Sequence, residues 1–211
     1  MDTYLGRSDV PTNTLLGPTV PPLCGACQNI SYCDKACQTT DWPTHKNVCK
    51  PYSQCTTSSR PGRNHRRVLV FDVAASKPQF EWLAVTPDCK EPLAQGQFFD
   101  GGGTTRMYFE DSRLMYSVHL WQPLGPSPFA SGGPNRAMDR LLGAEAAGVY
   151  RGTFIVVAYG VTDGGKNRRI VDAGCDVLQP VKQHLELRAG YKGPIFIAQP
   201  QERGPTLIWN T

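Results

Sequence analysis

The chain of 211 residues has no long hydrophobic run and no cysteine before position 24. A helix that spans a bilayer needs roughly 20 apolar residues, so the sequence predicts no membrane span. The first residues, MDTYLGRSDVPT, contain neither the apolar segment nor the cleavage pattern of a secretory signal peptide. We therefore expect an intracellular protein, nuclear or cytoplasmic or both, whose cysteines stay reduced.

Charge of either sign is also scarce. Charged residues make up 19% of the chain and the net charge is +4, which is too small to indicate nucleic acid or a membrane surface by itself. The hydrophobic types reach 40%, so the composition is not that of a disordered chain. The length suits one ordinary domain and a small additional module.

Cysteine and histidine are concentrated in residues 24–49, CGACQNISYCDKACQTTDWPTHKNVC. A Cys-x2-Cys pair lets two thiolates reach one ion across a tight turn, and the two later pairs have the four-residue spacing of one helical face. The segment has few large apolar side chains, so bound zinc would have to order it. A disulfide cluster is the alternative, and it needs an oxidising compartment. The six candidate ligands are Cys24, Cys27, Cys33, Cys37, His45 and Cys49.

The later pairs predict two short helices in this segment. For the second helix, Asp41 is a candidate N-cap and Pro43 suits the first turn, where its missing N–H costs nothing. Pro51 disfavours helical geometry at the residue before it, so this helix is expected to end near Cys49.

The phrases YCDKACQ and DWPTHKNVC resemble the MYND-type zinc finger, a cross-braced module that holds two zinc ions with seven cysteines and one histidine. The resemblance implies one complete Zn²⁺ site made by Cys24, Cys27, His45 and Cys49. It assigns Cys33 and Cys37 to a second site, whose other cysteine pair should precede Cys24. No cysteine occurs there, so the second site is expected to be partial, with Cys55 as a possible additional ligand.

The same resemblance implies an interaction module. MYND fingers typically bind short proline-containing peptides of partner proteins, often in transcriptional or protein-modification complexes. Gln38 and Trp42 occupy the positions that contribute to the peptide groove in that family. An indole face offers flat apolar area to a proline ring, and a glutamine can bond an extended backbone. Packing of Trp42 over the zinc site is the alternative.

The sequence predicts four segments. Residues 1–23 lack periodicity and are expected to be a disordered tail before the finger at 24–49. Residues 50–65 are polar and broken by prolines, as in a linker that makes finger and domain separate units. Short β-like runs in residues 66–211 predict an α+β domain with a mostly antiparallel sheet and two helices. The apolar run at 152–161 is the candidate central strand.

Local signals locate the other elements of this domain. Asn135 is a candidate N-cap of the first helix, and Gly143 is expected to end it. The second helix is expected either to be capped by Asp172 or to begin near Pro180. The runs PIFIA and TLIWN near the end of the chain are candidate edge strands of the sheet.

Two other functions are kept as alternatives. The arginines between Arg60 and Arg67 form a local basic cluster, which would suit a nucleic-acid-binding regulator or a solvated linker. An enzyme with an unrecognised site in residues 66–211 is the other alternative. His119 and His184 lie on separate predicted elements with no motif that ties them to a nucleophile, so we expect no catalytic activity.

Overall fold

The computed structural model describes residues 22–93, 95–99, 104–109, 114, 116–123, 132–162, 167–190, 195–197 and 206–208. The predicted tail, except for its last two residues, lies outside the described residues. Within the described ranges, no helix is long and apolar enough to cross a membrane.

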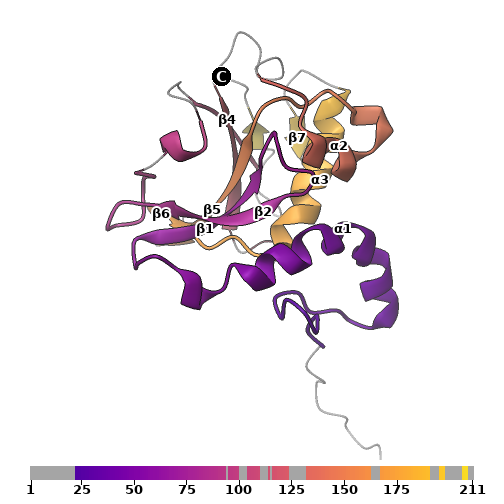
Figure 1. The fold of residues 1–211 in the computed structure, drawn as a ribbon, viewed down its shortest axis with the longest axis horizontal. Helices are drawn as coiled ribbons and strands as arrows, with labels where there is room; N and C mark the ends of the chain where they lie inside the picture. Colours follow the sequence, from indigo (N-terminus) through magenta and orange to yellow (C-terminus); the bar gives the residue numbers. More distant parts are fainter. Residues whose placement is uncertain are drawn as a thin grey trace, which may run out of the picture.

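A six-stranded antiparallel sheet forms the centre of the fold (Figure 1). The strands run in the order β2-β1-β5-β4-β3, and β6 pairs with the part of β5 beyond β1. Each of these pairings is antiparallel, which confirms the predicted α+β class with a mostly antiparallel sheet. The strands are β1 (His65–Phe71), β2 (Gln79–Ala84), β3 (Thr104–Phe109), β4 (Tyr116–Pro123), β5 (Phe154–Thr162) and β6 (Asn167–Val171).

Strand β5 is the central strand, as its apolar sequence predicts. It lies between β1 and β4, and its residues 154–159 are all buried. Alternate side chains point to opposite faces of a sheet, so β5 contributes to two cores. Val156 packs with Leu69 on one face, and Ile155 packs with Trp121 on the other.

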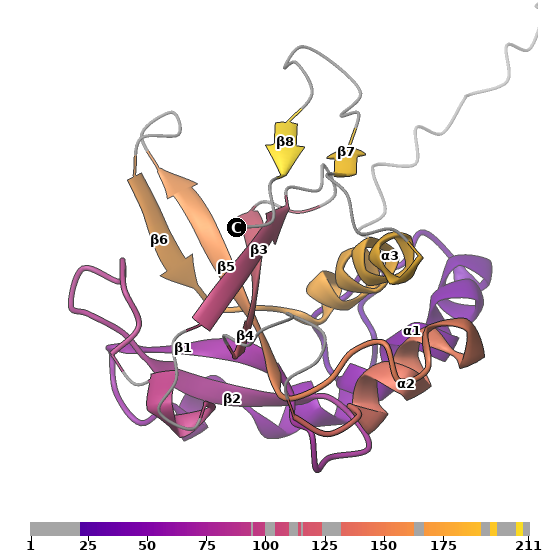
Figure 2. The same ribbon diagram turned by 90° about the horizontal axis from the view of Figure 1, so that it is seen from above.

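Three helices lie together on one side of the sheet (Figure 2). They are α1 (Lys35–Gln54), α2 (Arg136–Leu142) and α3 (Leu178–Ala189). Helix α2 begins and ends as predicted, because the Asn135 side chain accepts a hydrogen bond from the Met138 N–H and Gly143 ends the helix at φ 82°.

The prediction of two short helices in residues 24–49 is wrong, because α1 is one continuous helix. The Asp34 side chain caps it by accepting from the Cys37 N–H at 2.7 Å. Asp41, the predicted cap, lies inside the helix and accepts a hydrogen bond from the Tyr32 hydroxyl at 2.8 Å. Pro43 also lies inside, where it removes one backbone hydrogen bond without ending the helix.

The predicted helix end near Cys49 is also wrong. Helix α1 continues through Pro51 to Gln54, because its last turn packs on the sheet. Tyr52 lies edge-on to Phe80 of β2 at a ring distance of 5.2 Å, and Cys55 is buried in the core that contains Leu69. The first residues of the predicted linker are therefore helical and packed. The division of the chain into domains stays a prediction.

Two elements near the C-terminal end differ from expectation. Helix α3 begins at Leu178 after a 3₁₀ turn, which agrees with a start near Pro180. Asp172 does not cap it and instead accepts from the Arg67 backbone N–H at 3.0 Å. Strands β7 (Ile195–Ile197) and β8 (Thr206–Ile208) pair as a separate two-stranded sheet, so they are not edge strands of the main sheet.

Candidate metal centre

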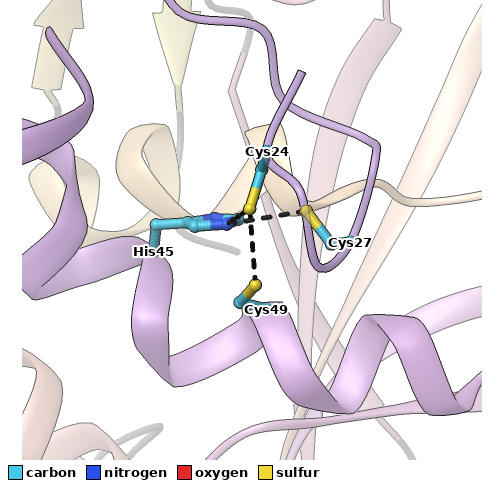
Figure 3. Close-up of side chains that lie close together, drawn as sticks. All are labelled: Cys24, Cys27, His45 and Cys49. Carbon is cyan, nitrogen blue, oxygen red and sulfur yellow. Dashed lines mark hydrogen bonds between the residues drawn. The ribbon is translucent and has the colours of Figure 1, made fainter. Parts of the chain in front are cut away.

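A tight turn at residues 24–27 holds the first two cysteines. The Cys24 N–H donates to the Ile30 carbonyl at 2.8 Å, and the Gln28 N–H donates to the Cys24 carbonyl at 2.8 Å. Gln28 adopts a left-handed φ of 52°, which reverses the chain after Cys27. Cys24 and Cys27 are both buried and face α1 (Figure 3).

Helix α1 supplies the other two ligands. His45 and Cys49 are four residues apart, so they project from the same face of the helix one turn apart. Both side chains are buried, with exposed fractions of 2% and 4%.

The four side chains meet at distances that fit one zinc ion (Figure 3). Zinc bonds of about 2.3 Å to sulfur and about 2.0 Å to nitrogen give a tetrahedron with edges of roughly 3.8 Å between sulfurs and 3.6 Å between sulfur and nitrogen. The Sγ atoms of Cys24 and Cys49 lie 3.7 Å apart. His45 Nε2 lies 3.4 Å from Cys24 Sγ and 3.5 Å from Cys27 Sγ. This donor set and these edges fit tetrahedral zinc with no open position.

The electrostatics of the metal-free cluster also favour a cation. Burial works to raise the pKa of Cys24, but the backbone N–H groups of Cys27 and Ala26 outweigh it and lower that pKa to about 6. Burial and the neighbouring Cys24 raise the pKa of Cys49 to about 12. The crowded sulfurs therefore do not all ionise without a positive charge between them, and a bound zinc ion deprotonates its thiol ligands.

A fifth cysteine, from the segment between β6 and α3, lies against this centre. Cys175 is buried, with its Sγ 4.0 Å from the carbonyl oxygen of Val48. Burial raises the pKa of Cys175, and the Cys27 side chain raises it further, so Cys175 remains a thiol. Sequence reasoning missed this contact, because nothing in the spacing connects position 175 with the finger.

The cysteine turn is also fastened to the segment before α3 through the Asn29 side chain. The Asn29 side-chain oxygen accepts a hydrogen bond from the Cys175 N–H at 2.5 Å. A Cβ atom at Gly174 would lie 2.8 Å from that same oxygen, so a glycine is needed for this close approach. The metal centre is therefore held from two sides, by α1 and by the segment before α3.

The second predicted ligand pair has a different arrangement. Cys33 is exposed, Cys37 is partly buried, and the two are joined by a disulfide. Together with Asp34 they form a group of three candidate ligands whose atoms lie within 4.8 Å of one another. A disulfide does not bind zinc, and the reduced group is one ligand short of a tetrahedral site, so this site is partial. Cys55 does not belong to either metal-ligating group of the described residues.

Comparison with known proteins agrees with the geometry. The family model of the MYND finger matches residues 17–49. This segment is a MYND finger. A stretch of 38 residues of the chain is 47% identical to Tudor domain-containing protein 1 of Danio rerio, a match that covers 18% of this chain and 3% of that relative. No solved structure matches the chain. MYND fingers are zinc-binding modules, and the cluster at Cys24, Cys27, His45 and Cys49 supplies the site.

The two predicted peptide-binding residues of the MYND finger line one surface cavity. Gln38 and Trp42 line it together with Lys35 and Thr39, and its volume is about 280 Å³. Trp42 is 46% exposed, and its ring centre lies 5.9 Å from that of His45. Trp42 therefore packs beside a zinc ligand and also presents apolar surface to solvent. Its orientation agrees with both interpretations of this residue.

Two arginines of the predicted basic cluster form contacts within the fold. Arg67 is buried and donates hydrogen bonds to the carbonyls of Cys55 and Ala173 and to the Tyr52 hydroxyl. Arg60 forms an ion pair with Asp172. These two arginines are therefore not available as a solvent-facing pair for phosphate groups.

Among the described residues, the ring contacts of His119 and His184 do not bring either histidine together with a nucleophile. His119 lies against Tyr159 at a ring distance of 4.1 Å, and His184 stacks on Phe109 at 4.5 Å. Burial lowers the pKa of each histidine to about 4, helped by nearby arginines. Both imidazoles are therefore neutral near pH 7 and pack as aromatic side chains.

Proposed function

We propose that this protein is a non-catalytic adaptor whose MYND finger binds a proline-containing peptide of a partner protein. The exposed indole of Trp42, fixed on a helix that zinc anchors, is the observation that carries the proposal. A proline ring packs on the indole face, and Gln38 hydrogen-bonds the backbone of the extended peptide.

The zinc site makes this surface rigid before a peptide arrives. Trp42 lies three residues before His45 on α1. When His45 binds the metal, it therefore also fixes the helical turn that presents the indole of Trp42. A surface that is ordered in advance loses less conformational entropy on binding. Zinc and peptide binding are therefore coupled in this proposal.

The predicted α+β domain of residues 66–211 serves as a scaffold in the proposal. Cys175 and Asn29 join it to the cysteine turn, and Arg67 joins it to the end of α1. The neutral His119 and His184 pack as aromatic side chains, and the closed metal site offers no open position for a substrate or an activated water. A transcriptional or protein-modification complex, inside the cell, is the proposed setting.

Truncation of Trp42 is expected to weaken peptide binding strongly. Trp42→Ala removes the apolar platform, and we expect a loss of about 2 kcal/mol, or roughly 30-fold in Kd. Gln38→Ala removes one hydrogen bond to the backbone of the peptide and should cost about 1 kcal/mol of binding free energy. Isothermal titration of the full zinc-loaded chain with the best peptide from a proline-rich library measures both changes.

Leu187→Ala is the matched control, because Leu187 is 59% exposed on α3 and lies outside the cavity. This variant should bind the peptide like the unmodified chain. The proposal is wrong if Trp42→Ala and Leu187→Ala bind equally, or if the zinc-loaded chain binds no proline-rich peptide at all.

A further inference from the structure

A second and larger cavity lies between α1 and the edge strand β2. Its volume is about 570 Å³, and it shares no lining residue with the cavity of Gln38 and Trp42. Both elements are near neighbours in Figure 1, where α1 runs below β2. The residues that matter for the argument are Lys46 and Lys50 of α1, Lys77 before β2, and Phe80, Glu81 and Trp82 of β2.

The charge of this cavity is predominantly positive. Lys46, Lys50 and Lys77 are exposed, and none of their three ammonium groups has a hydrogen bond or ion pair among the described residues. Glu81 is the one acidic residue of the lining. Lysine side chains with no partner of their own favour a ligand that carries several negative charges.

The wall formed by β2 has an unpaired backbone edge. The carbonyls of Trp82 and Ala84 accept hydrogen bonds from Gln97 Nε2 and the Leu93 N–H, on the side of β2 that faces away from β1. Backbone groups alternate sides along a strand, so the N–H and C=O of Phe80 and the N–H of Trp82 also face away from β1. These three groups have no hydrogen-bond partner in the part of the chain that the structure describes.

We propose that this cavity binds an extended acidic segment of a partner protein, which pairs with β2 as an additional strand. The backbone of this segment donates a hydrogen bond to the free carbonyl of Phe80 and accepts hydrogen bonds from the free N–H groups of Phe80 and Trp82. Every second side chain of the bound segment then points toward α1, and its carboxylates form ion pairs with Lys46 and Lys50. This second docking site goes beyond the proposed peptide cavity at Trp42, and each site can fail without the other.

The geometry favours a peptide over a nucleic acid. A row of backbone donors and acceptors matches another strand, whereas the sugar-phosphate backbone offers acceptors and few donors. No arginine lines the cavity, and the neighbouring Arg60 and Arg67 are engaged in bonds within the fold. Proline-rich peptides lack N–H groups for a strand ladder, so this site and the Trp42 cavity select different sequences.

Fluorescence anisotropy with the full zinc-loaded chain tests the charge requirement. The probe is a short labelled peptide of alternating glutamate and valine, compared with its lysine and valine counterpart and with a single-stranded oligonucleotide. We expect the acidic peptide to bind best.

Lys50→Glu should weaken the binding of the acidic peptide about tenfold, because attraction at the lining of the cavity becomes repulsion. Lys90→Glu makes the same charge change outside the cavity and should alter Kd less than about twofold. Trp42→Ala should leave this binding unchanged.

Residue-resolved hydrogen exchange tests the strand pairing. On binding the acidic peptide, the amides of Phe80 and Trp82 should exchange more slowly, while the amide of Glu81, which faces β1, should not change. The proposal is overturned if those two amides are unaffected, if Lys50→Glu and Lys90→Glu weaken binding equally, or if the oligonucleotide alone binds. Protection of both amides in the free chain would also overturn it, because another segment or a second copy would then already occupy the edge.

Discussion

Replacement of His45 by Ala is expected to release zinc and to lower the melting temperature of the whole chain. The variant keeps three ligands, and a structural zinc site of this kind contributes on the order of 10 kcal/mol to folding. The metal joins the cysteine turn to α1, and α1 with its C-cap residue places Val48, Cys49 and Cys55 in the same core as Leu69 of β1. We expect one cooperative transition shifted down by about 10 °C or more, measured by calorimetry.

Cys89→Ser is the matched control for this experiment, because Cys89 is a cysteine outside both metal-ligating groups. It should keep its zinc and melt near the unmodified chain. Two separate transitions in His45→Ala, with the upper one unchanged, would contradict the shared core and support the flexible linker that the sequence predicts.

Arg67→Ala is expected to be the most destabilising change away from the metal. The guanidinium donates to the carbonyls of Cys55 and Ala173 at 2.7 and 3.0 Å and to the Tyr52 hydroxyl at 2.8 Å, and it lies over the Tyr52 ring at 4.1 Å. Alanine leaves two buried carbonyls without these donors and opens a cavity between α1 and the sheet. We expect a loss of about 3 kcal/mol in the free energy of unfolding, measured by denaturant titration.

Arg169→Ala provides the comparison, because Arg169 is exposed on β6 and carries the same charge. Its effect should be within about 0.5 kcal/mol. Equal stability of the two variants would show that Arg67 does not fasten the finger helix to the sheet.

The metal centre could be predicted from the sequence because its chemistry is local. Cys-x2-Cys and the four-residue spacing of His45 and Cys49 each place two ligands on one short element, and these two elements lie close in the chain. Local capping chemistry likewise predicted α2 from Asn135, and the apolar run predicted the central strand β5.

The helix bounds could not be predicted in the same way, because tertiary packing overrides local signals. Pro43 and Pro51 each remove one backbone hydrogen bond from α1. Local sequence signals therefore predict that a helix starts near Pro43 and ends before Pro51. The burial of Tyr52 and Cys55 against the sheet offsets that loss, and it depends on strands far along the chain.

Long-range partners also changed the interpretation of single residues. Arg67 belongs to a basic cluster in the sequence, yet the fold buries it beside Ala173. Asp172 has the features of a helix cap, yet it pairs with Arg60. Cys175 has no neighbour of its kind in the sequence, yet it lies against the metal centre. None of these contacts has a local signal, because each joins segments more than a hundred residues apart.

The zinc content of the purified chain tests the central claim most directly. Elemental analysis of protein prepared without chelator should give one zinc per chain, held by Cys24, Cys27, His45 and Cys49. Cys49→Ser should lose this zinc. A folded chain that contains no zinc would contradict this claim. Two full equivalents of zinc would show that Cys33 and Cys37 form a second site with further ligands beyond the candidates named above.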